Sequence, residues 1–170
     1  MPRYVALLRA VNVGGTGKLS MNDLRAMCVD AGFSRVETYI ASGNVILESA
    51  ADANAVKLEL EARLAGHAGK PLGVLVRTAA EMRAVLEANP FADRPAKFTI
   101  AIFLDGPPPA DALANARGLD SEETRLGARE IYVHYPEGMG RSKLVIPAAR
   151  SGTARNMNTV GKLAALAAKP

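Results

Sequence analysis

The glycine-rich stretch LLRAVNVGGTGKLSM, residues 7–21, contains the residue types that most directly suggest phosphate chemistry. A phosphate-binding P-loop has the pattern GxxxxGK followed by Ser or Thr, in which backbone N–H groups surround the phosphates and the hydroxyl binds magnesium. Here Asn12 stands in place of the first glycine and Leu19 in place of the hydroxyl residue. The stretch also lacks the last glycine of GxGxxG, so neither nucleotide-binding pattern is present.

A simpler role in anion binding remains open for the same stretch. It leads into a helix expected to begin near Ser20, and the N–H groups and dipole at a helix start attract anions. Lys18 adds a positive charge, and Asn12, directly after a buried strand, has an amide that needs partners in a turn or in a ligand. The alternative is a long strand-to-helix connection whose lysine is solvated.

Residues for acid–base, nucleophilic or metal chemistry are few. His67 is expected in the last turn of a helix, and His134 in a strand, and for both we expect a structural or surface role, although either histidine can carry a proton. Cys28, the single cysteine, falls on the apolar side of a helix, which favours buried packing over a reactive thiol. HExxH and GxSxG are absent, so we expect no metal and no cofactor.

The elements that position these residues follow from periodicity and end signals. In the first half, Val56, Leu60 and Leu64 recur at helical spacing, and two β-rich runs flank Ala41, Ser42 and Gly43 as a hairpin. The sequence predicts, in order, a strand over 4–8, a helix from Ser20 to Ala31, strands over 36–40 and 44–49, a helix within 52–67 and a strand over 72–76. This βαββαβ order is typical of a ferredoxin-like plan.

The second half predicts a smaller α+β unit. Thr78 and Glu81 form a capping box for a helix through about Ala88, which Pro90 ends, and NPFADRPA (89–96) is a linker candidate. After it we expect a strand over 97–104, a proline-started helix in GPPPADALANAR, a hairpin of ETRLG with EIYVHY and a final helix over 153–168. The fold class expected is therefore α+β, with a ferredoxin-like subdomain over 1–88 and a smaller subdomain over 89–170 whose C-terminal helix packs back on the first.

Charge is unevenly distributed along the chain. The formal net charge is +4, but residues 131–170 carry six basic side chains against a single carboxylate, an excess of five positive charges. Such a local field attracts anionic partners or substrates, unless the basic segment is a solvated tail.

No apolar run approaches the roughly 20 residues that a membrane span needs. We therefore expect a cytoplasmic protein without a membrane partner. The sequence leaves its oligomeric state open.

Several stretches together resemble one bacterial family. LLRAVNVGG with Lys18 and Met21, TYIASGNVILES, and RSKL followed by TARNMNTVGKL are similar to the domain of unknown function 1697 family. The resemblance covers residues 3 to about 166. It implies the same two-part α+β fold and no particular activity.

The family pattern also implies a set of site residues. They are polar and fall in loops and in the last helix, where they would hold and orient an anionic ligand between the two halves: Arg9, Asn12, Lys18, Ser42, Asn44, Lys143, Arg155, Asn156, Asn158, Thr159 and Lys162. Where the family usually carries tryptophan, this chain has Met157, which offers no indole N–H. The structural alternative is a buried amide network that ties the last helix to the first half.

Four functions stay open on this basis. The first is a binding module for a phosphate-bearing small molecule. The second is nucleic-acid binding, against which aromatic residues are scarce at 5%. The third is an enzyme acting on an anionic small molecule, with Lys18 or Lys143 as the electrophile and no evident base. The fourth is a structural or interaction protein.

Overall fold

The computed structural model describes residues 1–9, 19–39 and 43–170. The described chain forms two compact units, residues 1–82 with 163–170, and residues 83–162. It has a mixed α+β fold with two four-stranded antiparallel sheets and four α-helices among the described residues. None of the described helices has the length and apolar character needed to cross a membrane.

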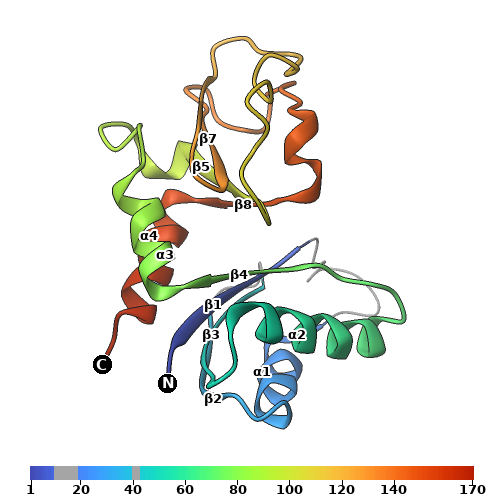
Figure 1. Ribbon diagram of the computed structural model, residues 1–170. Coiled ribbons are helices and arrows are strands. Elements are labelled where there is room, and N and C mark those ends of the chain that lie inside the picture. The colour runs from blue at the N-terminus through green and yellow to red at the C-terminus, as the bar shows by residue number, and fades with distance from the viewer. Residues whose placement is uncertain (10–18, 40–42) are drawn as a thin grey trace. The chain divides into compact units, whose positions relative to one another are not determined.

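The first unit is built on a sheet with the strand order β2-β3-β1-β4 (Figure 1). Its elements are β1 (Arg3–Leu8), α1 (Met21–Asp30), β2 (Ser34–Tyr39), β3 (Asn44–Glu48), α2 (Ala53–Ala68) and β4 (Val74–Thr78). The types and order of these six elements confirm the prediction for the first half. β4 is displaced by two residues, because the predicted run included Leu72 and Gly73, and β2 begins two residues earlier than predicted.

Local signals set the ends of these helices. The Ser20 hydroxyl accepts a hydrogen bond from the Asp23 N–H at 3.0 Å and caps α1. Gly69, at φ +71°, ends α2 in the left-handed conformation that glycine adopts without strain. The capping box is formed in both directions, since the Thr78 N–H donates to Glu81 at 2.9 Å and the Glu81 N–H to Thr78 at 3.1 Å.

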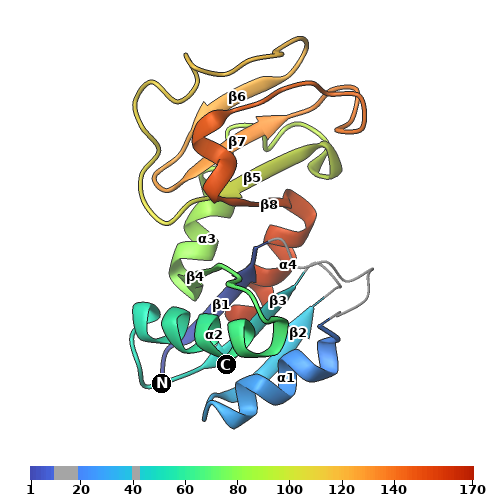
Figure 2. The same cartoon turned by 90° about the vertical axis from the view of Figure 1, so that its right-hand side faces the viewer.

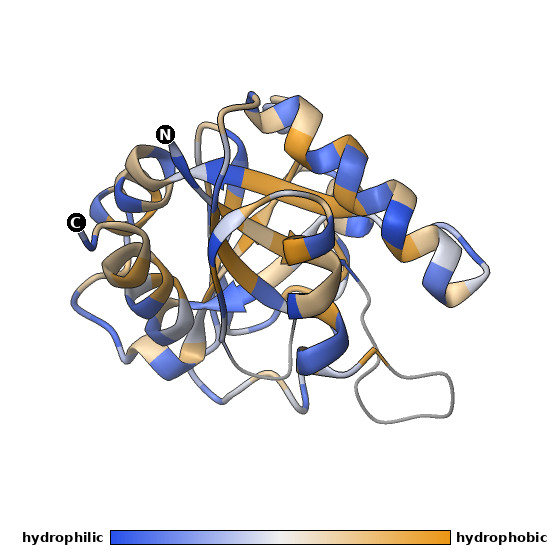
Figure 3. Ribbon diagram, turned by 90° about the horizontal axis from the view of Figure 1, so that it is seen from below, coloured by the Kyte–Doolittle hydropathy of each residue, from blue (hydrophilic) through white to orange (hydrophobic). Residues whose placement is uncertain are grey.

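Helices α1 and α2 cover one face of this sheet (Figure 1). Their apolar side chains pack on alternate residues of the strands, and Leu24, Cys28, Val56, Leu60 and Leu64 are fully buried there. Figure 3 shows the result as hydrophobic strands next to helices with alternating hydrophilic and hydrophobic stripes. This confirms the inward positions predicted for α2 and the buried packing predicted for Cys28.

The opposite face of the same sheet is closed at one end by the last residues of the chain. Arg3 donates through Nη1 to the carbonyl of Leu166 at 2.9 Å, and Arg35 donates through Nη2 to the carbonyl of Pro170 at 2.7 Å. Glu48 pairs with Arg35 at 2.7 Å and lies 3.8 Å from Arg3. The carbonyls at the end of α4 (Met157–Ala167) thus receive arginine donors, which suit the negative end of a helix dipole.

Side chains of α2 also form hydrogen bonds with backbone groups at the outer edge of β4. The Glu61 carboxylate accepts from the Val74 N–H at 3.0 Å, and Lys57 donates to the Val74 carbonyl at 2.7 Å. Lys57 and Glu61 lie 2.8 Å apart, one helical turn from each other. The pair therefore acts as a clamp between α2 and the backbone of β4.

The second unit has a sheet of strand order β6-β7-β5-β8, visible side by side in Figure 2. Its strands are β5 (Thr99–Phe103), β6 (Glu123–Leu126), β7 (Glu130–His134) and β8 (Thr153–Asn156), with short 3-10 helices η1 (Ala96–Phe98) and η2 (Pro147–Ser151). Helix α3 (Ala79–Glu87) begins in the first unit and ends in the second. The predicted subdomain boundary at 88/89 falls just after this helix and stays a prediction.

Two elements predicted for the second half are wrong. Residues 107–109 have no regular structure and 110–115 form turns rather than a helix, and the three consecutive prolines lack N–H groups and restrict the residues before them. Residues 153–156 form β8 rather than the first turn of the last helix, because they pair with β5, where Ala101 faces Arg155. Tertiary pairing overrides a weak helix preference here.

Substitution of Leu60 by Ala is expected to lower the free energy of unfolding by about 2–5 kcal/mol, because it opens a cavity in the core between α2 and the sheet. Leu58 is the matched control on the same helix, since it is 56% exposed, and Leu58→Ala is expected to stay within about 0.5 kcal/mol of the unmodified protein. Urea denaturation of both variants measures the difference. Equal losses would contradict the described burial of α2.

Candidate functional site

The predicted binding residues divide between the two units. Asn12, Lys18 and Ser42 lie outside the described residues. Arg9 and Asn44 belong to the first unit, and the others to the second: Lys143, Arg155, Asn156, Asn158, Thr159 and Lys162.

In the first unit, Asn44 has a structural task. Its side chain is fully buried and donates through Nδ2 to the Tyr39 carbonyl at 3.0 Å, across the last pair of residues of the β2–β3 hairpin. Arg9, just past β1, is half-buried, and its backbone N–H donates to the Gly73 carbonyl at 2.9 Å. Asn44 thus holds the strand ends together at the position where the sequence predicted a ligand contact.

In the second unit, Arg155 lies in β8 and not on the last helix. It is only 6% exposed, and its Nη1 donates to the Thr153 hydroxyl and to the Ala154 carbonyl, both at 2.9 Å. Burial lowers the pKa of Arg155 to about 10, so the guanidinium stays protonated at neutral pH. The prediction that Arg155 belongs to the last helix is therefore wrong, because β8 ends before α4 begins.

The start of α4 uses one of the predicted residues as a cap. The Asn156 side-chain oxygen accepts from the Thr159 N–H at 2.9 Å, the contact that an asparagine makes at a helix start. Thr159 is itself buried. Asn158 and Lys162 are exposed and lie four residues apart, on the same face of α4. Of the predicted residues on this helix, these two are open to solvent.

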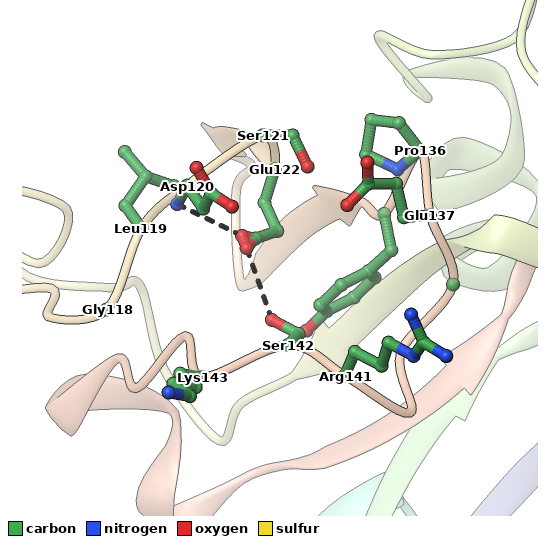
Figure 4. A pocket seen from close by; sticks show the side chains of 12 residues that line it. Gly118, Leu119, Asp120, Ser121, Glu122, Pro136, Glu137, Arg141, Ser142 and Lys143 are labelled. Carbon is green, nitrogen blue, oxygen red and sulfur yellow. Dashed lines mark hydrogen bonds between the residues drawn. The ribbon is translucent and has the colours of Figure 1, made fainter.

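Lys143 lies elsewhere in the second unit, at a pocket of about 380 Å³ (Figure 4). Three segments line the pocket, 118–122, 135–138 and 141–143, and none of the predicted residues from β8 or α4 is among them. Predicted residues that were expected in one site therefore occupy two places in this unit.

Backbone contacts hold these segments together. Arg117 and Val145 form an antiparallel bridge, with N–H to carbonyl distances of 2.8 and 2.7 Å. Next to it, a Cβ placed on Gly118 would lie 2.1 Å from the Lys143 carbonyl oxygen, and Gly118 has φ +74°. Only glycine fits this close approach, so Gly118 sets the distance between the two walls of the pocket.

Glu122 is the most constrained charged group in the pocket. It is half-buried and accepts from the Asp120 N–H at 3.2 Å and from the Ser142 hydroxyl at 3.3 Å, as drawn in Figure 4. The Ser142 oxygen in turn accepts from the Leu144 N–H at 3.2 Å. Burial, and next the negative charge of Glu122, raise the pKa of Tyr135 at the pocket wall.

The other charged side chains of the pocket are exposed. Arg141 and Lys143 lie on either side of Ser142 (Figure 4), and Asp120 and Glu137 lie on the facing segments. Among the described residues, none of these four side chains forms an ion pair with another. The pocket thus presents both signs of charge to solvent.

Sequence reasoning missed most of this pocket. Arg141 and Ser142 stand directly before Lys143 in the RSKL motif, which singled out only the lysine. Glu122 and Tyr135 carry no comparable local signal, because they reach the pocket from other segments through the fold.

Outside the pocket, the side chains that could act as nucleophiles, acids or bases are buried or lie at a helix end. The Thr99 hydroxyl lies 2.9 Å from His134 Nδ1, a pairing that activates nucleophiles in some enzymes, but Thr99 is fully buried and His134 nearly so. His67 lies in the last turn of α2, as predicted. The described residues contain no group of three or more His, Cys, Asp or Glu side chains suited to a metal ion.

Replacing Asn156 by Ala is expected to lower the free energy of unfolding by about 1 kcal/mol, because the Thr159 N–H loses its cap. Asn156→Asp keeps an acceptor oxygen and is expected to retain most of the stability. Urea denaturation measures both, with Asn158→Ala as the control from the exposed face of the same helix. An equal loss in the control would argue against the capping role.

The Cys28 thiol is expected to resist modification in the folded protein. Burial raises its pKa to about 12, so the reactive thiolate is scarce at pH 8. In the unfolded chain the same thiol ionises near pH 9, so stability is expected to fall as the pH rises from about 9 towards 12. A colorimetric assay with a thiol reagent, with and without denaturant, measures the resistance of Cys28 to modification. Rapid native labelling at pH 8 would contradict it.

Comparison with known proteins identifies similar chains. The conserved bacterial protein SP0830 from Streptococcus pneumoniae, a solved structure, is 25% identical with a TM-score of 0.80, and the match covers 98% of each chain. No curated protein matches. The model of the family described as Protein of unknown function (DUF1697) matches residues 1–132, whereas the RSKL and TARNMNTVGKL stretches lie beyond that match. The chain belongs to this family.

Proposed function

We propose that this protein binds a small anionic ligand that bears a phosphate group, and that the pocket containing Arg141 and Lys143 receives it. The observation that carries the proposal is the pair of exposed basic side chains at a pocket of about 380 Å³, within the range of small-molecule sites. Neither side chain forms an ion pair with another described residue. Charge-assisted hydrogen bonds from both are therefore available to a ligand.

The distribution of charge supports the same reading. The excess of positive charge over residues 131–170 includes both side chains, and it attracts anions over distances of about 10 Å at ordinary ionic strength. Ser121 and Ser142 add hydroxyl groups to the pocket lining. We retain Asn158 and Lys162 as a second pair of exposed groups on α4 that can contact an anion.

Nucleic-acid binding is favoured less. Single-stranded DNA and RNA are bound largely by stacking of bases on exposed aromatic rings. Tyr135 is the one aromatic residue among the described residues that line the pocket, and it is 8% exposed. Base stacking on this ring would require the pocket wall to open.

We also propose that the first unit has a ferredoxin-like plan. The βαββαβ element order, the strand order β2-β3-β1-β4 and two helices on one face support this classification. A cytoplasmic location likewise stays a proposal, consistent with a chain that has a single cysteine.

A thermal-shift screen with small phosphate esters tests the binding function. We expect a ligand present at 100 times its dissociation constant to stabilise the fold by about 2.7 kcal/mol, which corresponds to several degrees in Tm. Arg141→Ala and Lys143→Ala are each expected to weaken binding about tenfold, because each removes a charge-assisted hydrogen bond.

Lys70→Ala is the matched control, since it removes the same charge from an exposed position in the first unit. It is expected to leave binding unchanged. A single-stranded oligonucleotide belongs in the same screen at low and moderate ionic strength. The proposal fails if no phosphate ester shifts Tm, or if all three variants respond to it as the unmodified protein does.

A further inference from the structure

We infer that Glu122 makes this pocket selective for phosphate esters that also carry a protonated amine. The inference rests on the proposed anion-binding function and specifies the ligand class that the same pocket takes. It follows from the position of Glu122, from its lack of a basic partner and from the balance of charge around it.

The carboxylate of Glu122 is held in a defined orientation. One oxygen accepts from the Asp120 N–H and the other from the Ser142 hydroxyl, so both walls of the pocket fix it. An ionised carboxylate has about four lone-pair directions, of which these contacts use two. Glu122 thus keeps the capacity to accept further hydrogen bonds from a ligand in the pocket.

Glu122 also differs from its neighbour in the chain. Glu123 forms an ion pair with Arg94, whereas Glu122 forms none with any described residue. Glu122 lies close enough to the buried phenol of Tyr135 to raise its pKa. A charge against such a low-dielectric wall attracts an opposite charge more strongly than a fully solvated charge does.

The charges of the pocket favour a ligand that carries both signs. Arg141 and Lys143 attract a phosphate group, whereas Asp120, Glu122 and Glu137 attract a cation and weaken the binding of a ligand that is only anionic. A molecule with a phosphate at one end and an ammonium group at the other meets an opposite charge with each. The volume of about 380 Å³ restricts such a ligand to a small molecule.

Two pairs of probes, in which the members of each pair differ only in the amine, test this inference. Isothermal titration calorimetry compares 2-aminoethyl phosphate with ethyl phosphate, and 3-aminopropyl phosphate with propyl phosphate in case the longer span fits better. We expect the unmodified protein to bind at least one amine-bearing probe about tenfold more tightly than its amine-free counterpart, because an ammonium–carboxylate hydrogen bond is formed.

Glu122→Gln is expected to abolish this preference while leaving the affinity for ethyl phosphate equal or higher. The glutamine oxygen can accept from the Asp120 N–H while its amide group donates to the Ser142 hydroxyl oxygen, so both contacts at the pocket wall can be retained. Glu87→Gln is the matched control, because it removes a carboxylate from an exposed position of the same unit outside the pocket. It is expected to keep the preference.

Ser142→Ala gives an independent variant in case Glu122→Gln does not fold. It removes one of the two bonds that orient Glu122 and is expected to reduce the preference partly. Equal binding of the paired probes by the unmodified protein, or an undiminished preference in Glu122→Gln, overturns the inference and leaves the proposed function intact. Failure of all four probes to bind overturns the proposed function itself.

Discussion

The backbone bridge between Arg117 and Val145 is the interaction on which the second unit depends most. One face of its sheet, which carries Ile100, Ile131 and Val133, is covered by irregular chain and the short 3-10 helix η2 instead of an α-helix. The bridge joins two of these covering segments next to the apolar residues Leu113 and Leu144, which pack on the sheet. The same cross-link fixes the spacing of the pocket walls. Core and pocket in this unit therefore share one support.

The polar residues suggested by the family resemblance divide into two kinds. The side-chain amides of Asn44 and Asn156 form hydrogen bonds with the backbone, one at a hairpin end and one at a helix start. Lys143, Asn158 and Lys162 are exposed and contribute little to holding the fold. Asn44 and Asn156 thus have structural roles within their own units, whereas a binding role for the exposed residues stays a proposal.

The first half was predictable because its signals are local. Ser20, Gly69 and the Thr78–Glu81 box each mark a helix end within a few residues of chain, and the spacing of Val56, Leu60 and Leu64 marks one helix face. In the second half, Thr153–Asn156 became a strand through pairing with residues fifty or more positions earlier, which no local pattern records. The pocket was missed for a similar reason, since Glu122 and Tyr135 meet Arg141 only after three segments come together.

The clamp of Lys57 and Glu61 on Val74 bears on how copies of this protein behave when they meet. An exposed strand edge offers free N–H and C=O groups on which another chain can add a strand, and this is a common route to aggregates. At β4 those groups of Val74 are already occupied by side chains of α2. At the other edge, the register of β2 is broken between Ser34 and Glu37, next to Arg35 at φ 49°. Both borders of this sheet are thus poor templates, which favours solubility at high concentration.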